Sequence, residues 1–264
     1  MKFPRRVEYL KNRPTGVKFW DEHWHKQDVK RQVEQVGKDP VTMIVRKWIE
    51  DTIGEGEHPG ILEGGCGTGR YLVYFGKLGY DMIGLDFSVS AVEAAQKIDA
   101  NLKVVQATVL DLPFASESFD YYLSFGVLEH FIDGPEQGLK EAHRVLKENG
   151  MFFLSVPYMS NWRLLEERFP ALLGKSSSRQ GELKGNFYQY YFTKEELNYL
   201  LTSLGFKVLK DYPVNQELGL LRAVPFARKN RALNYFVINL ARVSKFLLPH
   251  FCAHMILLIC RKVD

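Results

Sequence analysis

The sequence contains few of the residues that build disulfide scaffolds and metal clusters. Its three cysteines, Cys66, Cys252 and Cys260, are odd in number and lack C-x-x-C spacing. This pattern favours neither a disulfide framework nor a structural zinc site, and it fits a protein of the reducing cytoplasm. No stretch is both long and uncharged enough to predict a membrane span.

The sequence also lacks a strong charge bias and a recognisable targeting segment. The formal net charge is +4, and basic residues are interspersed with acidic ones over most of the chain. Because no basic groove interleaved with aromatics is evident, no nucleic acid partner is expected. The segment Met1–Arg6 is basic but lacks the apolar core of a signal peptide. At 264 residues and 46% hydrophobic content, we expect one cytoplasmic α/β domain with insertions.

A glycine-rich segment, Ile61–Arg70, is the feature around which the chain is organised. Its first residues are apolar and follow the turn-forming Pro59 and Gly60, which predicts a buried strand. An acidic residue then precedes four closely spaced glycines: Glu63 is followed by Gly64, Gly65, Gly67 and Gly69. The apolar Tyr71–Phe75 predicts a helix docked on a sheet. A strand, a glycine loop and a helix allow backbone N–H groups to approach a ligand closely.

The spacing of this loop distinguishes between nucleotide-like ligands. It lacks the two-residue gap of the dinucleotide fingerprint G-x-G-x-x-G, and no Gly-Lys-Ser/Thr of a Walker phosphate loop follows. The Glu63 carboxylate would repel a diphosphate but attract a ligand that carries an amino group and a sulfonium. The segment Glu63–Gly69 resembles the first motif of the class I S-adenosylmethionine (SAM)-dependent methyltransferases. The resemblance implies that SAM is held at this loop by Glu63, Gly64, Gly65, Cys66, Gly67 and Gly69.

The end of the next predicted strand, 81–86, is expected to hold the ribose. Asp86 ends this strand about 20 residues beyond the glycines, where a ribose-binding carboxylate is expected. The alternative is that Asp86 caps the following helix, although Ser88 or Ser90 could do so instead. Phe87 is placed to form a wall beside the adenine.

The segment after predicted strand 103–107 is expected to meet the adenine. Thr108–Phe114 resembles the family's segment at this point, most clearly at its Leu-Pro-Phe end. It departs at Thr108, where the family commonly has Asp. Three alternatives follow for the adenine amino group: the hydroxyl of Thr108, the carboxylate of Asp111, or backbone groups of Val109.

The end of predicted strand 121–125 is expected to face the methyl donor, because ligands bind beyond the carboxyl ends of parallel strands. This places Phe125 beside the cofactor. The Leu-Glu-His that follows is similar to small-molecule methyltransferases of the ubiquinone-biosynthesis type. His130, with Glu129 beside it, is the candidate general base; the alternative is a structural histidine. Gly126 stands where some relatives have a further acidic residue, so no metal is assigned.

The rest of the chain completes a predicted doubly wound, mostly parallel sheet of seven strands. A helix over 134–146 precedes strand 151–157, and 205–208 and 254–260 supply the last strands. A capping box beginning at Thr193 starts another helix. The resemblance covers about residues 40–212 and the final strand. We therefore expect an N-terminal lid or helical segment (1–40) and a methyltransferase domain (41–264), with insertions at about 158–190 and 213–250.

Three segments leave alternatives open. A helix with Trp20 and Trp24 one turn apart either packs on the domain or closes over the site as a lid. The tyrosines of 187–192 either line an acceptor pocket or pack in the core. Residues 222–248 predict a basic amphipathic helix that contacts a membrane, covers a hydrophobic acceptor, forms a homodimer face or packs on its own domain.

Together these features predict a SAM-dependent methyltransferase that acts on an oxygen, or a nitrogen or carbon, of a small, hydrophobic or aromatic acceptor. Two other functions are weighed against it: a SAM-binding regulatory or scaffolding protein, and a nucleotide-dependent oxidoreductase. SAM binding without turnover would indicate the first, and thermal stabilisation by NAD alone would indicate the second.

Overall fold

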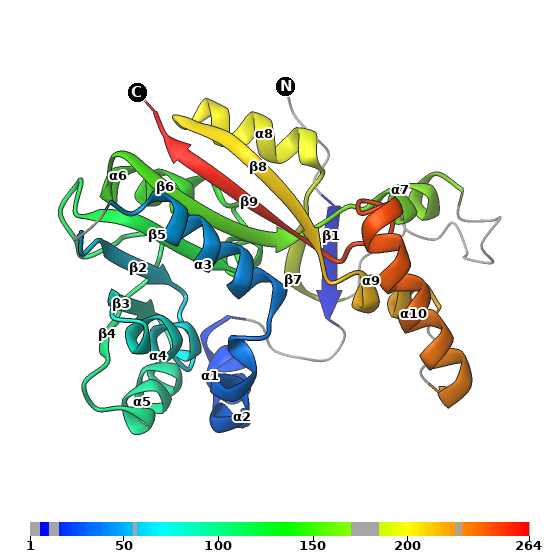
Figure 1. Cartoon of the computed structure of the whole chain (residues 1–264), viewed down its shortest axis with the longest axis horizontal. Helices are drawn as coiled ribbons and strands as arrows, with labels where there is room; N and C mark the ends of the chain where they lie inside the picture. Colours follow the sequence, from blue (N-terminus) through cyan, green and yellow to red (C-terminus); the bar gives the residue numbers. More distant parts are fainter. Residues whose placement is uncertain are drawn as a thin grey trace.

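A sheet of seven strands runs through the molecule (Figure 1). The computed structural model describes residues 6–10, 16–54, 57–169, 185–224, 227 and 229–263. The strands lie in the order β4-β3-β2-β5-β6-β9-β8. Their bounds are Gly60–Gly64 (β2), Asp81–Asp86 (β3), Lys103–Gln106 (β4), Phe119–Phe125 (β5), Leu146–Pro157 (β6), Phe206–Val214 (β8) and Met255–Lys262 (β9). β9 runs antiparallel to β6 and β8, and all other adjacent strands are parallel, so the predicted seven-stranded, mostly parallel sheet is confirmed.

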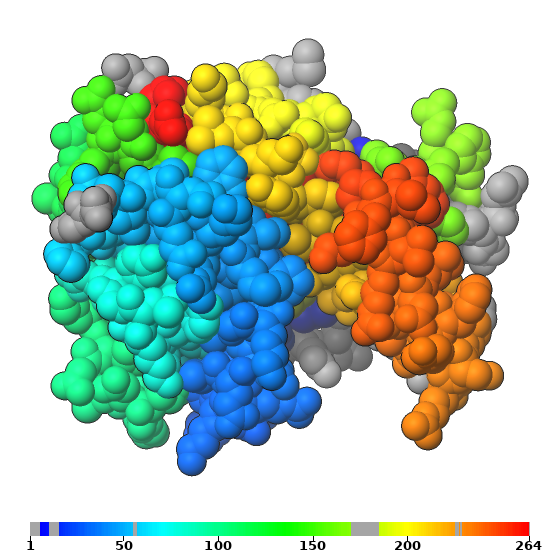
Figure 2. Space-filling model, in the orientation of Figure 1, coloured from blue at the N-terminus to red at the C-terminus, as the bar shows by residue number. Residues whose placement is uncertain are grey.

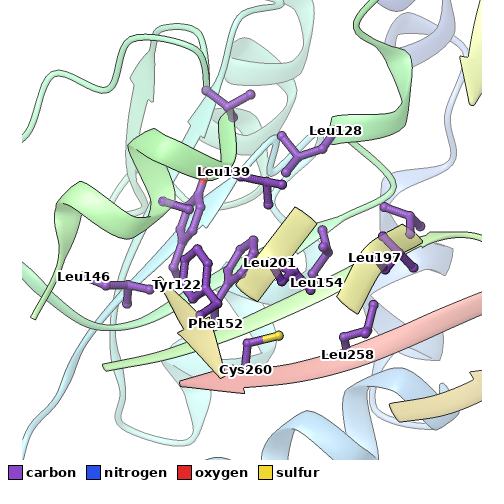
Figure 3. Close-up of a cluster of buried hydrophobic side chains, with 14 of the residues drawn as sticks. Tyr122, Leu128, Leu139, Leu146, Phe152, Leu154, Leu197, Leu201, Leu258 and Cys260 are labelled. Atoms are coloured by element: carbon purple, nitrogen blue, oxygen red, sulfur yellow. The ribbon is translucent and has the colours of Figure 1, made fainter. Parts of the chain in front are cut away.

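Helices cover both faces of the sheet, because neighbouring residues of a strand point to opposite faces. Phe152 belongs to the hydrophobic core under α6 and α8, whereas Phe153 belongs to the core under α3 and α4. Figure 3 shows the first core, with Tyr122 and Phe152 of the strands close to Leu201 of α8. The covering helices are α3 (Pro40–Thr52), α4 (Arg70–Lys77), α5 (Val89–Ile98), α6 (Glu136–Val145) and α8 (Lys194–Ser203).

Side-chain caps begin three of these helices at the residues where the sequence places a helix start. Asp39 accepts a hydrogen bond from the Val41 amide (3.2 Å), and Thr193 accepts one from the Glu196 amide (3.1 Å). Ser88 accepts the bond from Ala91 N that caps α5 (3.2 Å). Because Ser88 is the N-cap, the capping role considered for Asp86 is wrong.

A two-stranded antiparallel ribbon lies apart from the main sheet. It joins β1 (Arg6–Leu10) to β7 (Asn186–Tyr191), and Arg6 pairs with Tyr191. The sequence did not predict β1, because its partner strand stands far away in the chain. Two helices follow β1: α1 (Val17–His25) contacts α5, and α2 (Val29–Val36) contacts α4. Residues 1–5 and 11–15 of the predicted N-terminal segment lie outside the described residues.

The two predicted insertions form helices beside this ribbon. The first contains α7 (Asn161–Arg168) and β7, and its residues 170–184 lie outside the described part of the chain. The second contains α9 (Gln216–Ala223) and α10 (Arg231–Leu247), which pack on each other. In Figures 1 and 2, α10 is the orange helix that projects from the body of the protein. None of the described helices has the combined length and hydropathy that crossing a bilayer requires.

Candidate active site

A large cavity opens at the carboxyl ends of β3, β4 and β5, where the strand order reverses between β2 and β5. Its volume is about 1300 Å³. Cavities that hold one drug-sized ligand measure roughly 300–1,000 Å³. This cavity therefore has room for a nucleoside cofactor and a second molecule side by side.

The cofactor wall is the part of the cavity that follows β2 to β5. It is formed by Gly65, Asp86, Phe87, Thr108, Val109 and Phe125. The loop after β2 is pinned to β3, because the amides of Gly65 and Cys66 both donate to the Leu85 carbonyl (2.7 and 2.9 Å). Gly65 has a φ of +74°, and a Cβ there would lie 2.4 Å from a methyl carbon of Val127. Only glycine fits this turn.

Asp86 holds the glycine loop and still has acceptor capacity. One carboxylate oxygen accepts from the Gly67 amide (2.8 Å) and the other accepts from the Ser88 amide (2.9 Å). Burial raises the pKa of Asp86, and these two hydrogen bonds oppose that rise. Each oxygen of a carboxylate has a second lone pair, so this buried group can also accept from two ribose hydroxyls.

Glu63 lies behind the cavity surface, before the glycine loop, and its carboxyl is not fully satisfied. Its carboxyl is buried at the end of β2, and Oε2 has no hydrogen-bond partner among the described residues. Burial raises the pKa of Glu63 well above its usual value, although the charge of Arg70 opposes this. Buried carboxylate oxygens are normally satisfied, so an unpartnered one fits a ligand ammonium group. The chemistry of Glu63 therefore fits the amino-acid end of SAM, although its side chain does not line the cavity.

Other predicted cofactor residues lie behind the cavity surface. Gly64 ends β2, Cys66 and Gly67 belong to the loop, and Gly69 caps α4; none of the four lines the cavity. Trp24 covers Gly67, where a Cβ would lie 2.7 Å from the indole ring. Asp111 is exposed and lies outside the cavity, whereas Thr108 and Val109 line it.

His130 lies in the wall of the cavity, beyond the end of β5 in the short helix η1 (Leu128–His130). Its Nδ1 lies 2.7 Å from the carbonyl oxygen of Tyr188. Because a carbonyl only accepts, Nδ1 carries the proton and Nε2 keeps a lone pair. Burial lowers the pKa of His130 to about 4, so the ring is neutral at pH 7.

Glu129 lies next to this histidine but below the cavity surface. Its carboxyl is buried, Oε2 has no partner among the described residues, and Oε1 lies 3.8 Å from His130 Nε2. Burial raises the pKa of Glu129 to about 8, so it is protonated at neutral pH. The pair therefore comprises a neutral imidazole beside a neutral carboxyl, because burial disfavours the charged form of both groups.

The acceptor wall is the aromatic part of the cavity. It is formed by Phe19, Trp20, Phe131, Phe187 and Tyr188, with His130 among them. The His130 ring lies 4.8 Å from the Trp20 ring and 4.9 Å from the Tyr188 ring, centre to centre. The sequence did not single out Trp20 and Tyr188 as partners of His130, because the three residues stand in segments that are far apart in the chain. The one available signal was the i, i+4 spacing of Trp20 and Trp24.

Polar contacts fasten the N-terminal helices over the cofactor loop. Asp21 of α1 lies 2.5 Å from the hydroxyl of Ser88. Thr68 of the glycine loop donates to Gln32 of α2 (2.8 Å). Together with Trp24 on Gly67, these contacts place α1 and α2 across the loop that follows β2.

Comparison with known proteins identifies the family to which this chain belongs. The family model described as "Methyltransferase domain" matches residues 62–154, which span the glycine loop, Asp86 and the Glu129–His130 pair. The chain belongs to the class I SAM-dependent methyltransferases, and SAM is its cofactor.

Two relatives and one solved structure illustrate these similarities. A protein of Encephalitozoon cuniculi named as a methyltransferase is 32% identical over 165 residues, covering 60% of this chain and 74% of its own length. The demethylmenaquinone methyltransferase of Renibacterium salmoninarum is 27% identical, covering 64% and 73%. A Haloferax volcanii methyltransferase, solved with its activator Trm112, has a TM-score of 0.61 at 17% identity, covering 95% and 100%. This last likeness concerns the fold alone.

Proposed function

We propose that this methyltransferase acts on an oxygen, or a nitrogen or carbon, of a small hydrophobic or aromatic molecule. The observation that carries the proposal is a single cavity with a cofactor wall on one side and an aromatic acceptor wall on the other. Aromatic side chains supply apolar contact and ring stacking, which suit a planar acceptor. The similarity to a demethylmenaquinone methyltransferase supports an acceptor of this kind.

In this proposal Glu63, which lies behind the glycine loop, and the cofactor wall hold SAM together. SAM supplies an electrophilic methyl carbon when it is bound. Glu63 accepts hydrogen bonds from the ammonium group, and Asp86 accepts them from the ribose hydroxyls. Of the three alternatives for the adenine, we favour Thr108 and the backbone of Val109 over Asp111, because Asp111 lies outside the cavity. Phe87 and Phe125 give the nucleoside its apolar contacts.

His130 is the proposed general base. Its Nδ1–H is held by the Tyr188 carbonyl, so the lone pair of Nε2 is available to take a proton from an acceptor. Glu129 Oε1 lies 3.8 Å from Nε2, so the carboxyl dipole would stabilise the imidazolium that results. The aromatic wall would orient the acceptor and exclude water, which accounts for much of the rate in reactions governed by positioning.

We further propose that residues 1–40 act as a lid on the methyltransferase domain formed by 41–264. The support is the placement of α1, which contributes Trp20 to the acceptor wall and Trp24 to the cover of Gly67. For the cell compartment we expect the cytoplasm, because Cys66, Cys252 and Cys260 are buried and unpaired.

The decisive experiment supplies the purified protein with methyl-labelled SAM and, separately, with a small-molecule extract, total RNA and total protein. We expect label in one apolar small molecule, which mass spectrometry then identifies. Label in RNA or protein would contradict the proposed acceptor class. SAM binding in a thermal-shift assay with no labelled product in any fraction would instead favour a regulatory protein.

A further inference from the structure

An unpartnered apolar stripe runs along α10. Phe236, Leu240, Val243 and Leu247 stand at i, i+4, i+7 and i+11, which is the spacing of one helix face. All four are exposed, and Phe246 beside them is 82% exposed. Residues with this spacing normally face a protein core, so an exposed stripe of this kind indicates a binding surface.

Another face of α10 already attaches the helix to the domain. Val237 and Ala241 are buried there, one turn apart, and α10 packs on α9. The prediction that this helix simply packs on its own domain therefore accounts for one face only. The exposed stripe is a second apolar face, and no described element covers it.

The charges around the stripe all have one sign. Arg231, Arg242 and Lys245 are exposed and stand eleven and three residues apart, so they follow one line along α10. With about 3.6 residues per turn, the exposed Tyr235 and Phe246 lie between this line and the stripe, so the cations border the wider apolar face that these two residues complete. Between Glu217 and Asp264 the sequence contains no acidic residue. An apolar face with a cationic edge is the pattern of helices that lie in the headgroup region of anionic bilayers.

We propose that α10 docks this face on an anionic membrane surface. The apolar stripe would enter the boundary between headgroups and acyl chains, and the three cations would meet lipid phosphates. A second copy of the chain is a poorer partner, because its α10 carries no acidic residue that could pair with these cations. The lipid surface complements both the apolar and the charged parts of the face.

The position of α10 ties this surface to the acceptor wall. Arg222 of α9 lies 3.3 Å from the hydroxyl of Tyr191 in β7, and the same strand carries Phe187 and Tyr188 of the cavity. Figure 1 shows α10 on the side of the molecule toward which β6 points. If the proposed function holds, docking would turn the acceptor side of the enzyme toward molecules dissolved in the bilayer. Membrane binding itself requires no turnover, so the two proposals fail separately.

The test is flotation of the full chain with vesicles of phosphatidylcholine containing phosphatidylglycerol, and with phosphatidylcholine alone. We expect binding to the anionic vesicles only, weakening at about 0.5 M salt, where the Debye length falls to about 4 Å. Phe246→Ser with Leu247→Ser should abolish binding. The matched control is Met43→Ser with Val89→Ser, two exposed apolar residues on α3 and α5, which should bind like the wild type.

A second pair of variants tests the charges. Arg242→Gln with Lys245→Gln should weaken binding roughly fivefold for each removed charge. Lys77→Gln with Lys97→Gln removes two exposed charges from α4 and α5 and should change nothing. Light scattering on the same samples reports oligomeric state. A dimer that the Phe246→Ser/Leu247→Ser pair dissociates, or a monomer that binds no anionic vesicle at low salt, would overturn the proposal.

Discussion

The two walls of the cavity are built in different ways. The cofactor wall comes from one stretch of chain between Gly65 and Phe125, and its polar groups are held by backbone amides within that stretch. The acceptor wall joins α1, η1 and β7, which are far apart in sequence. A local loop suits a ligand common to the family, whereas the proposed acceptor would contact side chains from distant segments.

His130→Ala should lower turnover without changing the binding of the cofactor. Loss of a positioned general base lowers turnover by about 10²–10⁴-fold, while the Kd for SAM stays unchanged. Single-turnover kinetics and calorimetry measure the two quantities. His58→Ala, in the exposed loop before β2, is the control. Turnover equal to that of the wild type would remove His130 from the mechanism.

Asp86→Ala should weaken the binding of SAM. The variant removes the carboxylate that accepts from the amides of Gly67 and Ser88 and, in the proposal, from the ribose hydroxyls. We therefore expect the Kd for SAM to rise about 100-fold. Asp81→Ala lies at the other end of the same strand, where the carboxylate pairs with Lys103 at the surface. That control should bind SAM normally; equal losses in both variants would indicate general damage to β3.

Glu129→Gln should change how the free energy of unfolding depends on pH, which tests the state of the buried pair beside the acceptor wall. The folded state keeps the Glu129 proton up to a pKa of about 8, while the unfolded chain releases it near 4.5. The free energy of unfolding should therefore fall as pH rises, by about 1.4 kcal/mol per pH unit. The clean window is pH 6.5 to 8, because the lowered pKa of His130 has the opposite effect below 6.5.

Urea unfolding at several pH values measures this slope. In Glu129→Gln the slope between pH 6.5 and 8 should decrease, since the amide does not titrate. Glu93→Gln on the surface of α5 should retain the wild-type slope. The same slope in all three proteins would show that Glu129 ionises normally.

Trp20→Ala should have the smallest effect and concern the acceptor alone. The variant loses one ring contact with His130 and part of the aromatic wall, which we expect to raise the acceptor KM about five- to tenfold. The SAM affinity should change less than the acceptor KM. Trp162→Ala on α7 is the control, because Trp162 does not line the cavity. A selective loss of SAM affinity would place Trp20 in the cofactor lid instead.

Much of the cofactor wall could be predicted because its signals are local. The glycine loop, Asp86 at a strand end and the helix starts at Asp39, Ser88 and Thr193 each depend on residues within a few positions of one another. Hydrophobic periodicity likewise placed the seven strands in order along the chain. Asp111 shows the limit: a carboxylate in the right segment lies outside the cavity, because the turn after Thr108 directs it to solvent.

What the sequence alone determined is the class of fold, the cofactor loop and the existence of an amphipathic helix in the last insertion. The tertiary structure alone decided that β1 pairs with β7, that the Tyr188 carbonyl sets the tautomer of His130, and that one apolar face of α10 stays exposed. The physical reason is distance along the chain. Spacing along a helix or strand is set by the backbone, but contacts between remote segments form only when the whole core has packed.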